Sequence, residues 1–342
     1  MKKRLLAALM AGAMALSMAA CGNSNTDSTT QDTGSGDDAA AQAGDYNVGI
    51  VQLVQHEALD AATQGFQDKL KELIEAAGGS VEYAYQNAAN DSANCSTIVN
   101  GFVSSGVDLI MANATPALQA AQAATADIPI LGTSISDYGT ALGVDNWTST
   151  STSGTNISGT TDLAPLDGQA EMLQELFPDA KNVGLLFCSA EPNSRYQVDT
   201  IKPFLEEMGY TCTEYAFTDS NDVASVTQNA ASACDVIYIP TDNTAASCTE
   251  AIANVVLPAG VPVIAGEQGI CEGCGVATLS IDYYELGETT AQMAYDILVG
   301  GEDVASMNIQ FAPSQTKMYN PDICDQLGLT APEGYTAIEA AE

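Results

Sequence analysis

Val107-Asp-Leu-Ile-Met-Ala112 is followed, after one Ala-rich segment, by Ile128-Pro-Ile-Leu131, and the pattern returns as Asp235-Val-Ile-Tyr-Ile239 and Val261-Pro-Val-Ile264. Each of these runs is short, apolar and rich in branched residues, which predicts a buried strand. The segment between the members of each pair has helical periodicity, so each pair predicts a strand, a helix and a strand. The second copy of this unit predicts two similar α/β domains in tandem.

The residues around these units extend the same alternation in both halves of the chain. A Ser/Thr/Gly-rich stretch over 147–161 separates the halves. Strands that alternate with helices form parallel sheets, so we expect two doubly wound parallel-sheet domains. The expected strands are 47–54, 81–85, 107–112, 128–131, 182–187, 211–217, 235–239 and 261–264, and the expected helices are 59–77, 98–103, 115–126, 196–208, 222–233 and 245–257.

The N-terminus has the pattern of an export signal. Lys2, Lys3 and Arg4 precede an uncharged apolar run that ends in Ser17-Met-Ala-Ala-Cys21. Small residues before a Cys suit signal-peptide cleavage. The segment resembles the lipobox of bacterial lipoproteins, which implies a signal peptide over 1–20 and a lipid on Cys21. The alternative is an ordinary secretory signal with an incidental Cys.

Residues 21–45 complete this picture, because Gly22 to Asp45 contains only small and polar residues. Such a stretch has nothing to bury and predicts a disordered linker. We therefore expect a folded body held by its lipid at the extracytoplasmic face of the bacterial cell membrane.

The charge balance excludes several classes of function. Nine Lys and Arg stand against 44 Asp and Glu, a formal net charge of −35. So few cations cannot build a surface for nucleic acid. The single histidine, His56, excludes most His-dependent catalysis and the common His-containing metal motifs. The chain also lacks GxSxG, Walker and GxGxxG patterns. We expect no enzyme activity and no cofactor.

Several segments, in their order along the chain, resemble one family. They are Val48-Gly-Ile-Val-Gln-Leu-Val-Gln-His56, Asn156-Ile-Ser-Gly-Thr-Thr-Asp162, Glu191-Pro-Asn-Ser194, Pro240-Thr-Asp-Asn243 and Ile281-Asp-Tyr-Tyr-Glu-Leu-Gly287. The chain is similar here to the tryptophan/tyrosine-type substrate-binding proteins of ABC transporters, which have the type I periplasmic-binding fold. The resemblance implies capture of a small ligand by hinge closure and delivery to a permease that works with an ATPase.

This fold implies two lobes that share the chain unequally. The first would contain 46–162 and about 283–310, and the second 163–282 and about 311–342. The resemblance makes an aromatic amino acid the expected ligand, and nucleosides or branched-chain amino acids remain as alternatives.

The ligand site is expected in the cleft between the lobes, because ligands of parallel sheets bind outside the carboxyl ends of the strands. The loops at these ends are rich in amides, hydroxyls and carboxylates. The candidate ligand-binding residues are Gln52, Thr115, Thr133, Asn156, Asn193, Ser194, Asp242, Asn243, Glu267 and Asp282.

Three of these residues are expected to have specific roles. The family resemblance implies that the ligand carboxylate meets the helix start at Thr115 and that the ammonium meets Asp242. Thr115 and Asp242 can equally be helix caps. Asn156 is a hinge turn or a ligand contact. Tyr138 or Trp147 is a candidate to stack on the ligand side chain.

The cysteines permit a different class of function. Eight remain after Cys21, namely Cys95, Cys188, Cys212, Cys234, Cys248, Cys271, Cys274 and Cys324. An even count in an exported protein is compatible with disulfides, whereas free Cys inside helices and strands behaves as a small apolar residue. The pair Cys271 and Cys274 leaves a redox or metal-handling surface protein as the alternative function.

Overall fold

The computed structural model describes residues 43–144, 152 and 154–339. The expected signal peptide, Cys21, most of the expected linker and Trp147 lie outside the described residues. Among the helices of the described part, none has the length and apolar character that a membrane crossing needs.

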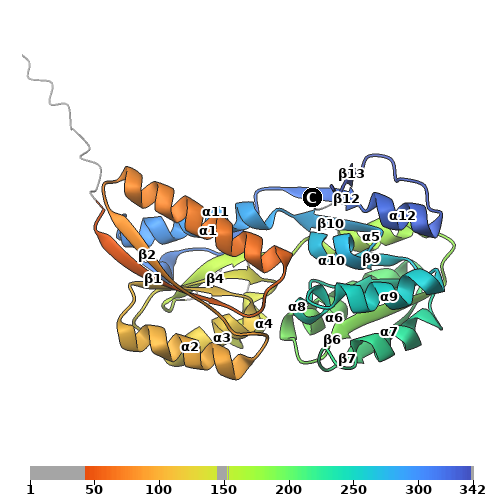
Figure 1. The fold of residues 1–342 in the computed structure, drawn as a ribbon, viewed down its shortest axis with the longest axis horizontal. Helices are drawn as coiled ribbons and strands as arrows, with labels where there is room; N and C mark the ends of the chain where they lie inside the picture. The colour runs from red at the N-terminus through yellow and green to blue at the C-terminus, as the bar shows by residue number, and fades with distance from the viewer. Residues whose placement is uncertain (1–42, 145–151, 153, 340–342) are drawn as a thin grey trace, which may run out of the picture. The chain divides into compact units, whose positions relative to one another are not determined.

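The first sheet has six parallel strands in the order β11-β5-β4-β3-β1-β2 (Figure 1). Its strands are β1 Asp45–Gln52, β2 Ser80–Asn87, β3 Leu109–Asn113, β4 Ile130–Ile135, β5 Ile157–Thr161 and β11 Gln310–Phe311. Side chains alternate between its faces, as in any strand. Val48 and Ile50 pack on one side, and Val51 packs on the other.

Two helix layers cover this sheet. The helices are α1 Glu57–Ala76, α2 Ser92–Ser105, α3 Thr115–Ala124, α4 Tyr138–Leu142 and α11 Tyr283–Leu298, with the short 3₁₀ turn η1 Val304–Ser306. Helices α1 and α11 bury Phe66 and Ala294 against one face, and α2 and α3 bury Phe102 and Leu118 against the other. Helix α11 therefore belongs to the first lobe although it follows most of the second in sequence.

The second sheet repeats this architecture with seven strands in the order β13-β12-β10-β9-β8-β6-β7. They are β6 Asn182–Cys188, β7 Thr211–Phe217, β8 Val236–Ile239, β9 Val263–Ala265, β10 Ala277–Ile281, β12 Gln315–Tyr319 and β13 Thr336–Ala337. Strands β10 and β12 pair antiparallel, and the other pairs are parallel.

Helices also cover both faces of the second sheet. They are α5 Leu166–Leu176, α6 Pro192–Glu207, α7 Val223–Ala231, α8 Asn243–Ala246, α9 Thr249–Ala259, α10 Gln268–Cys274 and α12 Pro321–Leu327. One buried cluster joins α5, α6 and α12 to the sheet, and another joins α7, α9 and α10 to its opposite face. The expected class, two doubly wound α/β domains, is confirmed.

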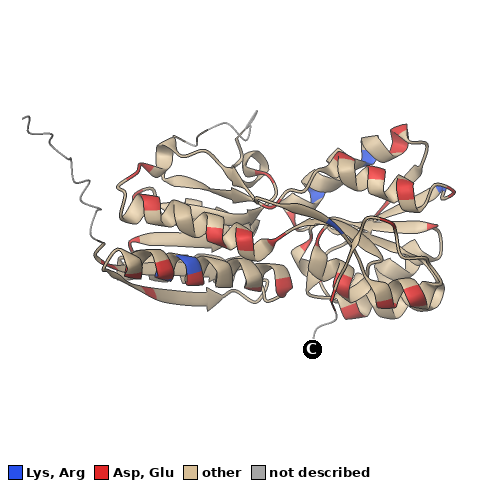
Figure 2. Cartoon of the chain, turned by 90° about the horizontal axis from the view of Figure 1, so that it is seen from above, with Lys and Arg blue, Asp and Glu red and all other residues tan. Residues whose placement is uncertain are grey.

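The chain passes between the two lobes after β5, after β10 and after β11 within the described residues (Figure 1). These three crossings lie at the carboxyl ends of their strands, where the loops of the two sheets meet. Asp and Glu residues are spread over the helices of both lobes, and Lys and Arg are few (Figure 2).

Three segments differ from the expectations. The helix expected over 245–257 is two helices, α8 and α9, separated by Ser247 and Cys248. The Ser/Thr/Gly-rich stretch contains strand β5, whose Thr160 hydroxyl lies 3.1 Å from that of Thr133 and 2.8 Å from that of Thr290. This internal hydroxyl network allows a polar strand to be buried. The segment after β9, for which the sequence predicts no helix, forms α10, and the Glu267 carboxylate caps it by accepting from the Gly269 and Ile270 N–H groups.

Candidate functional site

Polar residues occupy the carboxyl ends of the first sheet's strands. Gln52, at the end of β1, donates to Val54 O and Asp60 Oδ1 and accepts from the Thr63 hydroxyl. Thr133, near the end of β4, bonds to Thr160 and Thr290. Both side chains are therefore engaged inside the first lobe, where they tie strand ends to helices.

The start of α3 offers unused donors. Ala114 precedes this helix with φ +88°, and its side chain accepts no hydrogen bond from the first turn, which contains Thr115 and Pro116. The first N–H groups of a helix have no partner inside the helix, and together with the helix dipole they favour an anion. Thr115 is 2 % exposed and stands at this helix start.

Two unpartnered polar atoms lie next to this helix start. The Asn113 Oδ1 and the Ser134 Oγ are buried and have no hydrogen-bond partner within the described residues. Ser134 also has a positive φ of +56°. Left-handed backbone at a non-glycine residue and an unpaired buried hydroxyl are typical of binding sites, because a ligand can satisfy the orphaned group.

The second lobe presents acids at the corresponding strand ends. Asp242 follows β8 and is 1 % exposed. Its carboxylate caps α8 by accepting from Ala245 N at 2.8 Å, and it also accepts from Cys188 N at 2.6 Å. Burial, and then the neighbouring Glu191 carboxylate, raise the pKa of Asp242. The structure thus gives Asp242 the capping role that its sequence position also allowed.

Glu267, at the end of β9, is the second acid of this edge. It is buried and accepts from Gly269 N at 2.7 Å and from Ile270 N at 2.6 Å at the start of α10. Burial raises the pKa of Glu267 to about 7, against the lowering effect of these two donors. The Asp162 and Glu272 carboxylates add to the increase.

Asp162 lies at the first crossing between the lobes and is also buried. It accepts from the Ser136 hydroxyl of the first lobe and from the Tyr283 hydroxyl at the second crossing, both at 3.1 Å. Burial raises the pKa of Asp162 to about 6. Asp162 therefore joins groups from two hinge segments and from the β4 end.

Hydrogen bonds link the cleft edges of the two lobes. Gln197 of α6 donates to Ser136 Oγ at 3.1 Å. His56 Nε2 lies 3.2 Å from Asn243 Oδ1, and Asn90 Nδ2 donates to Thr244 Oγ1 at 3.1 Å. These contacts bring the strand-end loops of the two sheets face to face.

The structure thus gathers most of the candidate residues at the facing strand ends, namely Thr115, Asn193, Ser194, Asp242, Asn243 and Glu267. Asn156 lies elsewhere, at the amino end of β5, where its amide donates to Thr125 O and Ile128 O. Asp282 is exposed and caps α11 by accepting from Glu285 N at 3.0 Å.

The residues that the sequence interpretation missed are polar groups of the same edge, namely Ser136, Asp162, Glu191, Gln197 and Tyr283. Three of them, Asp162, Glu191 and Tyr283, could have been identified from the sequence, because they lie in strand-end segments that carry the family resemblance. Tyr138, by contrast, is 2 % exposed and donates to Gly132 O and Thr160 O, so its ring is part of the first lobe's structure.

Three cavities lie where the lobes meet. One of about 150 Å³ is lined by α1, α10 and the start of α11, and one of about 360 Å³ by the loop at His56, α8 and α10. The third, of about 270 Å³, is lined by aromatic residues from separate segments, Tyr138, Tyr196 and Phe311, together with Ser136. This third cavity adjoins the Ser136 and Asp162 pair.

Cys271 and Cys274 lie in α10, both buried, and all eight cysteines of the described residues are free. Burial raises the pKa of both thiols. The described residues contain no group of three or more His, Cys, Asp or Glu side chains placed to hold a metal. The two thiols pack in the core beneath α10.

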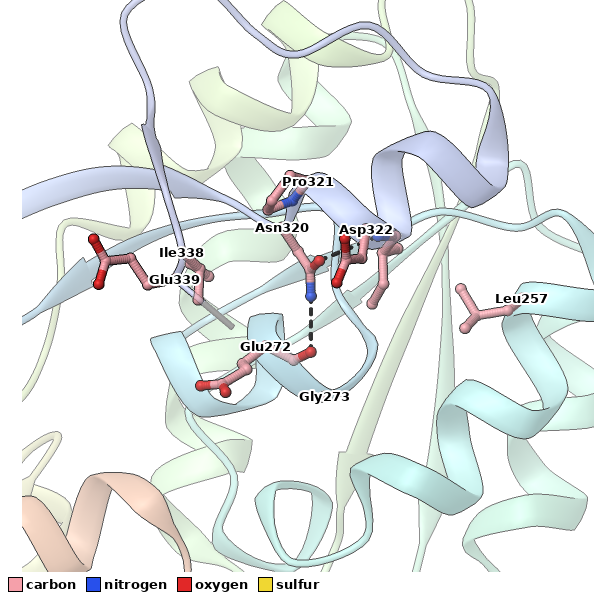
Figure 3. Close-up of a pocket in the computed structure, with 9 residues that line it drawn as sticks. Leu257, Glu272, Gly273, Asn320, Pro321, Asp322, Ile338 and Glu339 are labelled. Carbon is pink, nitrogen blue, oxygen red and sulfur yellow. Dashed lines mark hydrogen bonds between the residues drawn. The ribbon is translucent and has the colours of Figure 1, made fainter. Parts of the chain in front are cut away.

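A further cavity of about 320 Å³ lies beside α10, between α9 and α12 (Figure 3). Its centre is Asn320, which donates to Glu272 O at 2.8 Å and caps α12 by accepting from Ile323 N. These bonds fix α10 to α12, so we assign the polar groups here to the packing of the second lobe.

Comparisons with known proteins agree with this geometry. The family model described as ABC transporter substrate binding protein matches residues 47–341. A tyrosine-binding protein of Clostridioides difficile (strain R20291) is 33 % identical over 298 residues, which is 87 % of this chain and 85 % of that protein.

Two solved structures are similar over nearly their whole length. An ABC domain from Streptococcus pneumonia in complex with L-Trp is 30 % identical, with a TM-score of 0.78, over 85 % of this chain and 100 % of that one. A substrate-binding protein with adhesive properties from Clostridium difficile, in its ligand-free, open form, is 34 % identical, with a TM-score of 0.64, over 86 % and 100 %. These matches confirm the type I periplasmic-binding fold that the sequence motifs implied. The chain belongs to the family of ABC transporter substrate-binding proteins.

Proposed function

We propose that this substrate-binding protein captures an aromatic L-amino acid between its lobes and delivers it to the permease of an ABC importer. The observation that supports this best is the contrast between the two cleft edges. A helix start with unused donors and an orphaned Ser134 hydroxyl faces an edge with buried carboxylates. A zwitterion matches both edges at once.

The ligand carboxylate is proposed to bind at the start of α3. Ala114 leaves the first turn uncapped, and within the described residues no hydrogen bond is found to the first N–H groups of α3 or to the Thr115 hydroxyl, so these donors can receive an anion. Ser134 Oγ, which has no partner within the described residues, is the second donor.

The ammonium is proposed to bind at Glu267 and Asp162, because both carboxylates are buried and the charge of Asp162 helps to raise the pKa of Glu267. A carboxylate has about four acceptor positions. Asp242 accepts from two N–H groups that belong to separate elements, the start of α8 and the end of β6. Glu267 accepts from two N–H groups, and Asp162 from two hydroxyls, which leaves capacity on both. An ammonium between them would also lower the cost of burying two nearby acids.

The cavity of about 270 Å³ supports an aromatic side chain. Its rings, Tyr196 and Phe311, come from α6 and β11, and Phe311 is 51 % exposed although large and apolar. Ring–ring contacts of this kind add to the free energy of burial. The relatives agree, since one is a tyrosine-binding protein and another holds L-Trp.

Hinge closure is the proposed mechanism of capture. The chain superposes better on the L-Trp complex than on the open, ligand-free relative, although the open relative is the more identical in sequence. Hydrogen bonds between the lobes, such as that from Gln197 to Ser136, are what a closed form needs. A ligand that contacts both lobes would shift the protein toward this form.

As a member of its family, the protein works on the extracytoplasmic side of the membrane with a small-molecule ligand and an ABC transporter. We further propose that a lipid on Cys21 anchors it and that it converts no substrate. Replacing Cys21 by Ala should release the protein from the membrane fraction. Retention of the Cys21→Ala protein in that fraction would contradict the anchor.

Calorimetry on the protein without its N-terminal segment tests the ligand. We expect L-tyrosine or L-tryptophan to bind and to raise the melting temperature, because a ligand that binds only the native state stabilises it. L-leucine and adenosine represent the alternative ligand classes. Binding of either of these, with no response to the aromatic amino acids, would overturn the proposed ligand.

A further inference from the structure

Glu191, at the start of α6, has an unusual set of partners. It is 4 % exposed, and its side chain accepts no cap bond from its own helix. Five donors reach its carboxylate instead: Asn243 N at 3.0 Å, Asn243 Nδ2 at 2.7 Å, Thr244 N at 2.8 Å, Thr244 Oγ1 at 2.7 Å and Asn193 Nδ2 at 3.2 Å. The carboxylate thus holds the start of α8 in place.

Both residues that Glu191 holds on α8 reach across to the first lobe. Asn243 Oδ1 lies 3.2 Å from His56 Nε2, and Thr244 Oγ1 accepts from Asn90 Nδ2 at 3.1 Å. His56 directly precedes α1, and Asn90 lies in the loop after β2. One buried carboxylate of the second lobe therefore positions the two side chains that form these hydrogen bonds between the lobes.

The acceptor-only character of a carboxylate fixes the direction of these bonds. Because the Asn243 amide turns its NH₂ toward Glu191, its Oδ1 faces His56, and His56 must donate from Nε2. Because the Thr244 hydroxyl donates to Glu191, its lone pairs are left for Asn90. Glutamine at position 191 would present a donor and an acceptor, so it cannot hold both side chains in these orientations.

We propose that Glu191 is a positioning residue for closure, and that it orients Asn243 and Thr244 as a latch on His56 and Asn90 of the first lobe. This proposal deepens the proposed function and rests on its hinge closure. The latch contributes to the lifetime of the closed complex, because both bonds must break before the lobes separate. Its chemistry is independent of which ligand the cleft takes.

His56 makes the latch observable, because it is the only histidine of the chain. Burial in the latched form lowers the pKa of His56, against the raising effects of the Asn243 bond and of the Glu191 and Asp60 carboxylates. Glu57 and Glu272 line the same cavity as His56. An open His56 would be solvated and would titrate near the ordinary value of about 6.5.

The test is NMR titration of His56 in protein prepared without a histidine tag. With saturating L-tyrosine or L-tryptophan, we expect the wild-type His56 pKa to fall below its ligand-free value. In Glu191→Gln the ligand should no longer lower this pKa, and ligand dissociation in stopped flow should be about tenfold faster. Glu250→Gln, an exposed acid on α9, is the matched control and should leave both measurements unchanged.

A second variant tests the latch from the other lobe without touching the buried carboxylate. Asn90 is exposed and has a φ of +61°, so Asn90→Gly removes the side chain without backbone strain. We expect about threefold faster dissociation at an unchanged melting temperature of the ligand-free protein.

The outcomes separate the latch from the proposed function. Binding of an aromatic amino acid with no change in the His56 pKa, or unchanged dissociation in both variants, would overturn the latch and leave the proposed function standing. Failure of both amino acids to bind would overturn the proposed ligand. The His56 titration is then repeated with L-leucine or adenosine, whichever binds, and an unchanged His56 pKa on binding of that ligand would overturn the latch.

Discussion

The two lobes have the same architecture but opposite chemistry at the cleft. The first lobe ends its strands in amides, hydroxyls and the uncapped start of α3, with one buried carboxylate, Asp162, where β5 passes into the hinge. The second ends its strands in buried carboxylates, Glu191, Asp242 and Glu267. A doubly wound sheet brings the carboxyl ends of its parallel strands to one edge, so the sheet determines where a site lies. The loops that follow the strands determine the charge of the site.

This difference assigns separate tasks to the lobes. Buried carboxylates are unfavourable unless hydrogen-bonded or paired with a cation. On the second lobe, N–H groups and hydroxyls supply most of the hydrogen bonds, and none of the ion pairs found among the described residues involves these three acids. We therefore propose the acidic edge, together with Asp162, for the ligand ammonium and the start of α3 for the ligand carboxylate.

The largest effect should come from Glu267, an acid proposed to pair with the ligand ammonium. Glu267→Gln keeps the shape and one acceptor for the α10 start but removes the charge. We expect a loss of roughly 2–5 kcal/mol in the binding free energy of L-tyrosine, the range for removing one side of a buried charged pair. Titration calorimetry gives the value.

The control is 3-(4-hydroxyphenyl)propionate, which lacks the amino group. It should bind wild type weakly and lose little more affinity in Glu267→Gln. Equal losses for both ligands would show that Glu267 only caps α10, and the division of tasks between the lobes would fail.

The second effect is on stability against pH. Burial raises the pKa of Asp162 to about 6, of Glu267 to about 7, and that of Asp242 as well. Acids with a raised pKa in the folded state stabilise it below their unfolded pKa, and this contribution is lost as pH rises through the folded pKa. We therefore expect the free energy of unfolding to fall by roughly 2–4 kcal/mol from pH 4 to pH 8.

Hydrogen exchange locates this loss. The amides of β8 and β9 should lose protection as pH rises, beyond the intrinsic change in exchange rate, more than those of β1 and β3. The lowered pKa of His56 has the opposite effect, because it makes the free energy of unfolding rise with pH. This is one group against the three acids named above. Stability that rises from pH 5 to pH 8 would contradict the acidic edge.

A smaller effect is expected at Asp242, whose carboxylate joins the start of α8 to the end of β6. Asp242→Asn leaves one carbonyl oxygen to accept from both Ala245 N and Cys188 N, so a buried N–H loses its partner. We expect a decrease of roughly 1–3 kcal/mol in the free energy of unfolding. Chemical denaturation measures it.

Ligand affinity separates the two roles of Asp242. If Asp242 is mainly a cap, L-tyrosine binding should fall much less in Asp242→Asn than in Glu267→Gln. A loss of affinity larger than that of Glu267→Gln would move the ammonium to Asp242.

The sequence predicted the fold well for a physical reason. Buried parallel strands are apolar on both faces, so runs such as Val107–Ala112 and Asp235–Ile239 stand out, and their repetition predicts two lobes. Strand β5 was missed because its Ser158 and Thr160 hydroxyls are satisfied by Met307 O and by Thr133 and Thr290, contacts from distant segments.

The position of the site could be predicted from the sequence, but the role of each residue in it could not. Strand ends predicted its position, whereas the role of an acid depends on which donors reach it. Glu191 and Thr244 are far apart in the chain, yet their bond at 2.7 Å shapes the edge. Likewise Glu267 caps α10, a helix hidden from the sequence by its two internal glycines, and Gly273 is needed there because a Cβ would meet the Thr249 side chain.

The smallest effect is expected at Asp282, because this acid is exposed. Asp282 caps α11, as Asp242 caps α8, but its side chain is exposed at the hinge. Water can replace the bond from Glu285 N, so Asp282→Asn should lower the free energy of unfolding by less than about 1 kcal/mol and leave L-tyrosine affinity unchanged. Denaturation and calorimetry on the same preparation check both values. A loss of affinity without a loss of stability would place Asp282 among the ligand contacts and extend the acidic edge beyond the second lobe.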